Sequence, residues 1–62
     1  MRSSEVIKKL EKAGWREVRQ KGSHKHFRHP NKPGTVTVPH PSADIAIGTL
    51  KSIERLSGVK LR

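Results

Sequence analysis

The residues best placed to do chemistry form one short run, Gly22-Ser23-His24-Lys25-His26-Phe27. Glycine followed by serine predicts a tight turn, so the imidazole of His24 comes directly after a change in chain direction. An imidazole gains and loses a proton near neutral pH and can therefore act as a general acid or a general base. This run predicts proton-transfer chemistry.

The charge of the chain indicates which class of partner binds near such an imidazole. The 62 residues include 14 Lys and Arg, and the formal net charge is +9 at pH 7. An excess of this sign and size attracts polyanions. We therefore expect a phosphate-rich partner, an acidic protein partner, or both.

Length and composition bound the fold and the location. A chain of this size buries only about 60% of the surface that it exposes when unfolded, so we expect one domain, residues 1–62, with a thin core. The absence of cysteine fits a reducing compartment. No apolar run approaches the ~20 residues that cross a bilayer, so we expect a cytoplasmic protein without a membrane partner.

The first element is predicted to be a helix. Ser3 and Ser4 are both suitable N-caps, and Gly14 is expected to end the helix. The apolar residues at helical spacing are Val6, Ile7, Leu10 and Ala13.

Three strands should follow, at residues 15–20, 24–29 and 35–38, joined by turns at 21–23 and 30–34. Alternation along the second strand puts Phe27 toward the core and His24 toward solvent. His26 and Arg28 share the outward face of His24, and the other face includes Lys25 and His29. The apolar face of the sheet is expected to comprise Val18, Phe27, Val36 and Val38.

After the sheet, Pro39-His40-Pro41-Ser42 predicts an extended exit, because each proline biases the preceding residue away from helix. A loop over residues 43–48 should precede a last helix, which Thr49 can cap and Gly58 ends. Its apolar repeat is Leu50, Ile53 and Leu56. The expected fold is α+β, in the order α-β-β-β-α, with a three-stranded antiparallel sheet and both helices on one sheet face.

Segments along nearly the whole chain resemble the HicA family, the toxins of HicAB toxin-antitoxin systems. In order they are Ser3-Ser4-Glu5, Gly14-Trp15, residues 18–24, 27–30 and 36–40, and Gly48-Thr49-Leu50. The most specific part is the Gly-Ser-His turn followed by an aromatic residue.

The resemblance implies a fold like that of double-stranded-RNA-binding domains and an mRNA endonuclease (mRNA interferase) activity that blocks translation. It also implies neutralisation by a HicB-like antitoxin that buries the catalytic histidine. That histidine corresponds to His24, and the turn glycine corresponds to Gly22. Many relatives carry a second histidine directly after the first, whereas this chain has Lys25.

RNA can be cut without metal when a base removes the 2′-hydroxyl proton, an acid protonates the leaving 5′-oxygen, and cations stabilise the charge. His24 can supply one transfer, and surrounding positive charge favours the neutral imidazole of a base; the acid role stays open. We interpret His26 as a solvent-facing strand residue, with the missing acid or base as the alternative. The expected RNA contacts are Lys21, Gly22, Ser23, Lys25, His26 and Arg28.

Other chemistry fits less well. The spacing of His24, His26 and His29 is compatible with zinc, but alternation points His29 away and no cysteine completes a ligand set, so no metal or cofactor is expected. His29 and His40, beside prolines, are interpreted as structural or incidental. Trp15 is interpreted as a core residue, and two aromatic residues in all are too few for recognition by base stacking.

Two other functions remain compatible with the sequence. A basic α-β-β-β-α domain can be a non-catalytic double-stranded-RNA-binding module, which would bind RNA in a salt-dependent way without breaking it. It can also be a structural ribonucleoprotein component, although such chains usually carry lysine-rich tails and none is obvious here. Incubation of the protein with RNA in EDTA separates the enzyme from the binder.

Overall fold

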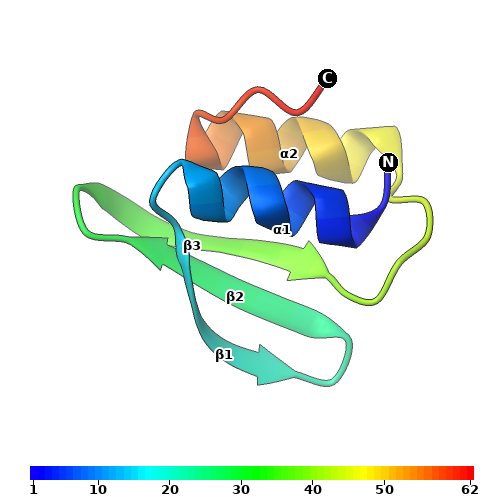
Figure 1. The fold of residues 1–62 in the computed structure, drawn as a ribbon, viewed down its shortest axis with the longest axis horizontal. Coiled ribbons are helices and arrows are strands. Elements are labelled where there is room, and N and C mark those ends of the chain that lie inside the picture. Colours follow the sequence, from blue (N-terminus) through cyan, green and yellow to red (C-terminus); the bar gives the residue numbers. More distant parts are fainter.

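The structure is a computed structural model that describes all 62 residues. Its elements are α1 (Ser3–Lys12), β1 (Arg16–Lys21), β2 (His24–His29), β3 (Lys32–Pro39) and α2 (Ile47–Ser57). The predicted order α-β-β-β-α is confirmed (Figure 1). None of the helices combines the length and the apolar character needed to cross a membrane.

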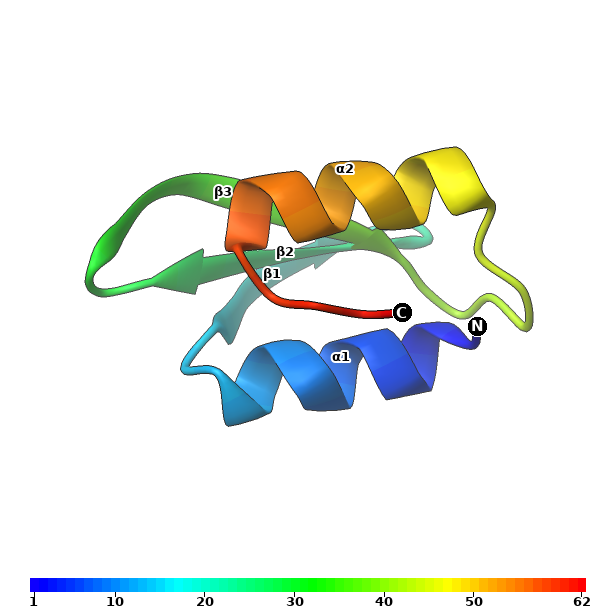
Figure 2. The ribbon, with the colours of Figure 1, turned by 90° about the horizontal axis from the view of Figure 1, so that it is seen from above.

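The three strands form one antiparallel sheet in the order β1-β2-β3. Both helices lie on the same face of this sheet, side by side, and they pack mainly on β3 (Figures 1 and 2). The strand β1 lies farthest from the helices, and all six of its residues are exposed. The opposite face of the sheet carries no helix; we call it the open face.

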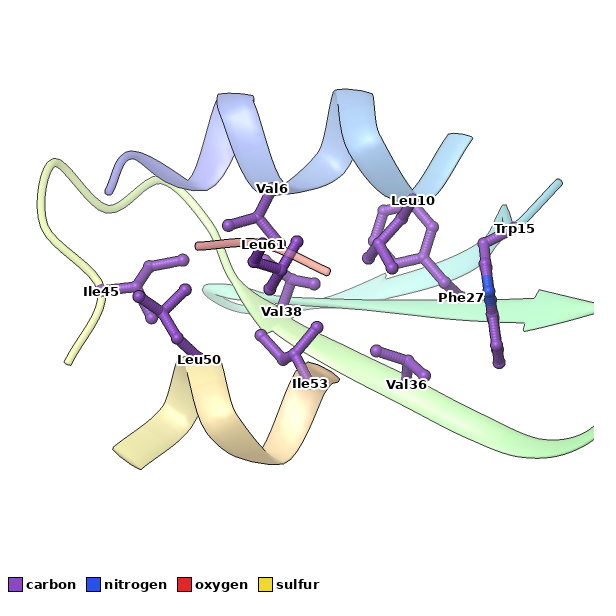
Figure 3. Packing of buried hydrophobic residues seen from close by; sticks show 10 residues of the cluster. All are labelled: Val6, Leu10, Trp15, Phe27, Val36, Val38, Ile45, Leu50, Ile53 and Leu61. Atoms are coloured by element: carbon purple, nitrogen blue, oxygen red, sulfur yellow. The ribbon is translucent and has the colours of Figure 1, made fainter. Parts of the chain in front are cut away.

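A single core lies between the helices and the sheet (Figure 3). Two of its members, Ile45 and Leu61, come from the loop before α2 and from the C-terminal segment, which runs between the two helices (Figure 2). Neither residue was expected in the core. The ten buried hydrophobic residues are Val6, Leu10, Trp15, Phe27, Val36, Val38, Ile45, Leu50, Ile53 and Leu61.

The start of α1 differs from the expectation that Ser3 or Ser4 caps it. The N-cap is Arg2, whose backbone N–H donates to a carboxylate oxygen of Glu5 at 3.1 Å. Ser3 is the first helical residue and is only 2% exposed, because its side chain points toward the loop after β3. The serine hydroxyl therefore serves a tertiary contact and not the helix end.

Gly14 joins α1 to β1 under the ring of His29. The φ angle of Gly14 is +101°, and a Cβ atom there would lie 2.7 Å from Nε2 of His29. That nitrogen donates to the carbonyl of Ala13 at 3.1 Å, while Nδ1 accepts from the backbone N–H of Asn31 at 3.0 Å. The same ring packs at 5.4 Å from the ring of Trp15, so His29 has the structural role that its place beside a proline indicated.

Val18 does not join the apolar face, contrary to the prediction; it is 54% exposed. The pairing of β1 with β2 shifts between Glu17 and Arg19, so Val18 is an extra residue in a bulge. As a result Glu17, opposite Phe27, lies on the helix-covered face. Strict alternation had placed Val18 there instead.

The strand β3 is longer than predicted, because it begins at Lys32 and not at Thr35. The turn before it is Pro30-Asn31, shorter than the expected 30–34. The pairing of β2 with β3 shifts between Phe27 and His29, and this irregularity absorbs the additional residues of β3. Lys32, Pro33 and Gly34, which were expected in the turn, are therefore part of β3.

The helix α2 starts two residues before the predicted cap Thr49, with Ala46 as its N-cap. It ends as predicted at Gly58, which has φ +73°, and Lys32 Nζ donates to the carbonyl of Ser57 at 3.1 Å. Leu56, the third residue of the apolar repeat, is 53% exposed. The buried face of α2 consists of Leu50, Ile53 and Ser57.

The C-terminal segment is held to α2 by the Glu54 carboxylate. It accepts from the backbone N–H of Leu61 at 2.8 Å and from the guanidinium of Arg62 at 3.1 Å. The Leu61 bond, with a further contribution from Arg62, holds the pKa of Glu54 below its ordinary value of 4.5, although desolvation acts in the opposite direction.

Candidate active site

The turn that precedes His24 consists of two residues, Gly22 and Ser23. Gly22 has φ +58° and Ser23 does not have a positive φ, which is the pattern of a type II′ hairpin turn with glycine in the first central position. Two hydrogen bonds hold the turn: Gln20 Nε2 donates to the Gly22 carbonyl at 3.2 Å, and the backbone N–H of His40 donates to the Ser23 carbonyl at 2.7 Å. The segment before His24 is therefore fixed from both sides.

His24 is the first residue of β2 and lies opposite Lys21 on β1 and Pro39 on β3. It is exposed, and its ring makes no hydrogen bond within the chain. It lies on the open face, because it alternates with Phe27, which is buried against the helices. Both ring nitrogens are thus accessible to a ligand.

His26 also lies on the open face, two residues along β2, and is half-buried. Its cross-strand neighbours are Arg19 on β1 and Thr37 on β3. Nδ1 of the ring is 3.0 Å from Oγ1 of Thr37, so the orientation of this imidazole is set by a hydrogen bond, unlike that of His24.

The charges on the open face are all positive. Arg19 and Lys21 face it from β1, because they are paired with His26 and His24, and Arg28 faces it from β2. The five carboxylates lie elsewhere, on the helices, on the helix-covered side of β1, and in the loop before α2. These carboxylates belong to Glu5, Glu11, Glu17, Asp44 and Glu54.

Lys25 is not brought together with His24, although it follows it in sequence. It lies on the helix-covered side of the sheet, and its Nζ is 2.8 Å from a carboxylate oxygen of Glu17, with 19% of the lysine side chain exposed. The structure thus gives Lys25 a partner on the other side of the strand from the candidate site. The other expected contacts, Lys21, Gly22, Ser23, His26 and Arg28, lie in the turn or on the open face.

A small polar network ties the site to the start of α1. The hydroxyl of Ser3 is 2.8 Å from Nδ1 of His40 and accepts from the backbone N–H of Ser42 at 2.9 Å. His40 in turn bonds the Ser23 carbonyl through its backbone. The helix, the loop after β3 and the Gly-Ser turn are connected through one buried hydroxyl.

Sequence reasoning missed four contributors to this site: Arg19, Gln20, Thr37 and Ser3. Strand alternation and the predicted pairing of the strands carried a signal for Arg19 and Thr37. The contact of Ser3 with His40 joins residues 37 positions apart, and no local pattern indicates it. No three His, Asp or Glu side chains lie close enough together to hold a metal ion.

Comparison with known proteins agrees with this description. The model of a family described as HicA toxin of bacterial toxin-antitoxin systems matches residues 3–59. A chain in the solved structure of a HicA3 and HicB3 toxin-antitoxin complex is similar over 100% of both chains, with 36% sequence identity and a TM-score of 0.78. No curated protein matches significantly.

Proposed function

Because the chain belongs to the HicA toxin family, we propose that it is an endoribonuclease toxin that cleaves mRNA with His24 as a proton-transfer group and that a HicB-like antitoxin neutralises it. The observation that carries the proposal is the place of His24. Its ring is exposed and unbonded, it follows a fixed turn, and it lies on a sheet face with cations and no carboxylate.

In the proposed reaction His24 removes the proton of a ribose 2′-hydroxyl, and the oxygen attacks the adjacent phosphorus. A neutral imidazole is needed for this step. The reaction develops negative charge on the phosphate oxygens. Lys21, Arg19 and Arg28 can stabilise that charge, arginine with its bidentate donors.

The RNA is proposed to lie across the open face, with the phosphate backbone as the main contact. Gly22 and Ser23 allow close approach at the turn, because a glycine has no side chain to exclude a phosphate. The face offers hydroxyl, imidazole and guanidinium groups but no Phe, Tyr or Trp side chain, so contacts to phosphates and 2′-hydroxyls dominate. We leave Lys25 out of this interface, since it is paired with Glu17 on the opposite face.

The antitoxin is proposed to cover His24 with an acidic surface. The similar chain from the HicA3 and HicB3 complex and the charge of +9 support this part of the proposal. Such a partner would exclude RNA and would stabilise the toxin by mass action. Expression of the chain alone should arrest growth, and co-expression of the antitoxin should restore it; free growth without antitoxin would count against toxicity.

The decisive experiment incubates the purified protein with end-labelled RNA in EDTA. We expect cleavage by the wild type and none by His24→Ala, with an unchanged unfolding midpoint and nearly unchanged RNA affinity. Cleavage by a His24→Ala sample purified free of host nuclease would refute the role of this residue.

The same experiment tests the second candidate function, a non-catalytic double-stranded-RNA-binding module, which the fold and basic surface also support. In that case the wild type would bind RNA, with log affinity falling against log salt by roughly 0.7 to 0.9 for each neutralised phosphate, and the RNA would stay intact.

A further inference from the structure

We propose that His26 is the second proton-transfer group of the site, the general acid that protonates the leaving 5′-oxygen while His24 acts as the base. The proposal rests on the proposed ribonuclease function and deepens it. It assigns a catalytic role to a residue that alternation alone presents as one more solvent-facing position.

His24 and His26 are two residues apart on β2 and share the open face. At about 3.3 Å per residue, their Cβ atoms lie about 7 Å apart and point the same way. An in-line displacement needs a base on one side of the phosphorus and an acid on the other, and two parallel imidazoles at this spacing can flank one phosphate.

A hydrogen bond joins Nδ1 of His26 to Oγ1 of Thr37, at 3.0 Å. A threonine hydroxyl accepts as well as donates. When Nδ1–H donates to it, Nδ1 keeps its proton in both the charged and the neutral ring. Nε2 is then the nitrogen that gains and loses a proton. Thr37 thereby orients His26 and leaves Nε2 for the substrate.

The groups that face His26 are cationic or neutral. Arg19 lies opposite on β1, Thr37 opposite on β3, and His24 and Arg28 are the next same-face residues on β2. Lys21 lies beside His24. No carboxylate is among them, so a phosphate of the substrate is the anion that can bind between the two rings.

Position 25 cannot take this role. Its side chain points to the helix-covered side and is bound to Glu17. An imidazole there would lie on the other side of the sheet from His24. In this chain the only second histidine on the same face as His24 is therefore His26.

The step balances without a further reactant. His24 takes the 2′-hydroxyl proton, the 2′-oxygen forms a bond to phosphorus, and the bond from phosphorus to the 5′-oxygen breaks. The 5′-oxygen takes the Nε2 proton of His26, which leaves a 2′,3′-cyclic phosphate and a 5′-hydroxyl. His24 ends protonated and His26 neutral, and solvent exchange restores both.

The test compares two RNA substrates in EDTA: an ordinary oligonucleotide, and one in which sulfur replaces the 5′-oxygen at the cleaved bond. A thiol ionises near pH 8.5, so it leaves as thiolate and needs no acid. We expect His26→Asn to slow cleavage of the ordinary substrate by about 10²- to 10⁴-fold and to remove the alkaline limb of its pH profile. The sulfur substrate should be cut at nearly the wild-type rate.

The matched control is the double variant Lys25→His with His26→Lys, which keeps composition and charge but moves the imidazole to the covered side. It should cut the ordinary substrate as slowly as His26→Asn. Unfolding midpoints of all variants in urea establish that each one is folded before its rate is compared.

The outcomes separate the two proposals. Cleavage of the ordinary substrate by His26→Asn at the wild-type rate, or an equal loss on both substrates, overturns the role of His26 and leaves that of His24 in place. Full activity of the double variant also overturns it. Failure of the wild type to cut either substrate would contradict both the ribonuclease function and the role of His26 as general acid.

Discussion

The backbone amide of His40 donates a 2.7 Å hydrogen bond to the carbonyl of Ser23, and this links the loop after β3 to the turn that carries His24. The ring of His40 is bonded in turn to the hydroxyl of Ser3, at the start of α1. The position of the candidate base thus depends on Ser3, a residue far from it in the sequence. This dependence can be measured.

Ser3→Ala should destabilise the fold by about 1–3 kcal/mol, because it leaves the N–H of Ser42 and the ring of His40 without their partner. Cleavage should fall as well, through loosening of the Gly-Ser turn. Urea unfolding and RNA cleavage measure the two effects. Ser4→Ala is the control, since Ser4 is exposed, and it should change stability by less than about 0.5 kcal/mol. Equal effects of the two variants would show that the Ser3 network is unimportant.

Gly14→Ala should be among the most damaging single substitutions, because its Cβ would lie 2.7 Å from Nε2 of His29 and its φ is +101°. The ring would have to leave its bond to Ala13, and we expect a loss of at least 2 kcal/mol. Thermal unfolding followed by the fluorescence of Trp15, which contacts His29, reports it. Gly48→Ala is the counterpart: it lies in α2 with no atom within 4 Å of its Cβ position, and it should stabilise by up to about 1 kcal/mol. A Gly14→Ala protein as stable as wild type would contradict the close packing at this junction.

Thr37→Val removes the hydroxyl that orients His26 and keeps the branched shape of the side chain. Cleavage should fall up to about tenfold, because the imidazole is no longer held in one orientation, and stability should fall by roughly 0.5–1.5 kcal/mol, the contribution of one ordinary hydrogen bond. Thr35→Val, on the same strand and without a side-chain hydrogen bond, should leave the rate unchanged. A pH profile of kcat for both variants checks this, and identical profiles would argue against an orienting role of Thr37.

Acidification should release the C-terminal segment. The pKa of Glu54 is lowered in the folded state, so its contribution to stability is present above the ordinary value of 4.5 and is lost as the pH falls through the lowered value. Glu54→Gln should therefore flatten the dependence of unfolding free energy on pH in this acidic range. Glu11→Gln, at an exposed position of α1, should keep the wild-type dependence. Parallel curves for wild type and Glu54→Gln would show that the carboxylate does not hold the segment.

The local sequence pattern was sufficient to predict which segments are helices and which are strands, and on which face of the sheet the His24 side chain lies. Alternation between Phe27 and His24 depends only on the two-residue period of a strand, and one buried aromatic residue is enough to assign both faces. The ends of the elements were less accurate. Thr49 and Ser3 have the chemistry of helix caps, but the helices begin at Ile47 and Ser3, next to the buried Ile45 and at the contact of Ser3 with Ser42.

An outward-facing imidazole behind a glycine turn, in a strongly basic α-β-β-β-α domain, could be predicted from the residues alone, because turn preference, strand period and charge are properties of neighbouring residues. The groups that surround that imidazole could not, because they depend on the three-dimensional fold. The bulge at Val18 places Glu17 on the helix-covered side, where it pairs with Lys25. Thr37, on the neighbouring strand, forms a hydrogen bond with His26. These contacts depend on strand register and on packing between residues far apart in the chain. The register is set by the free energy of the whole packed core, which no local pattern contains.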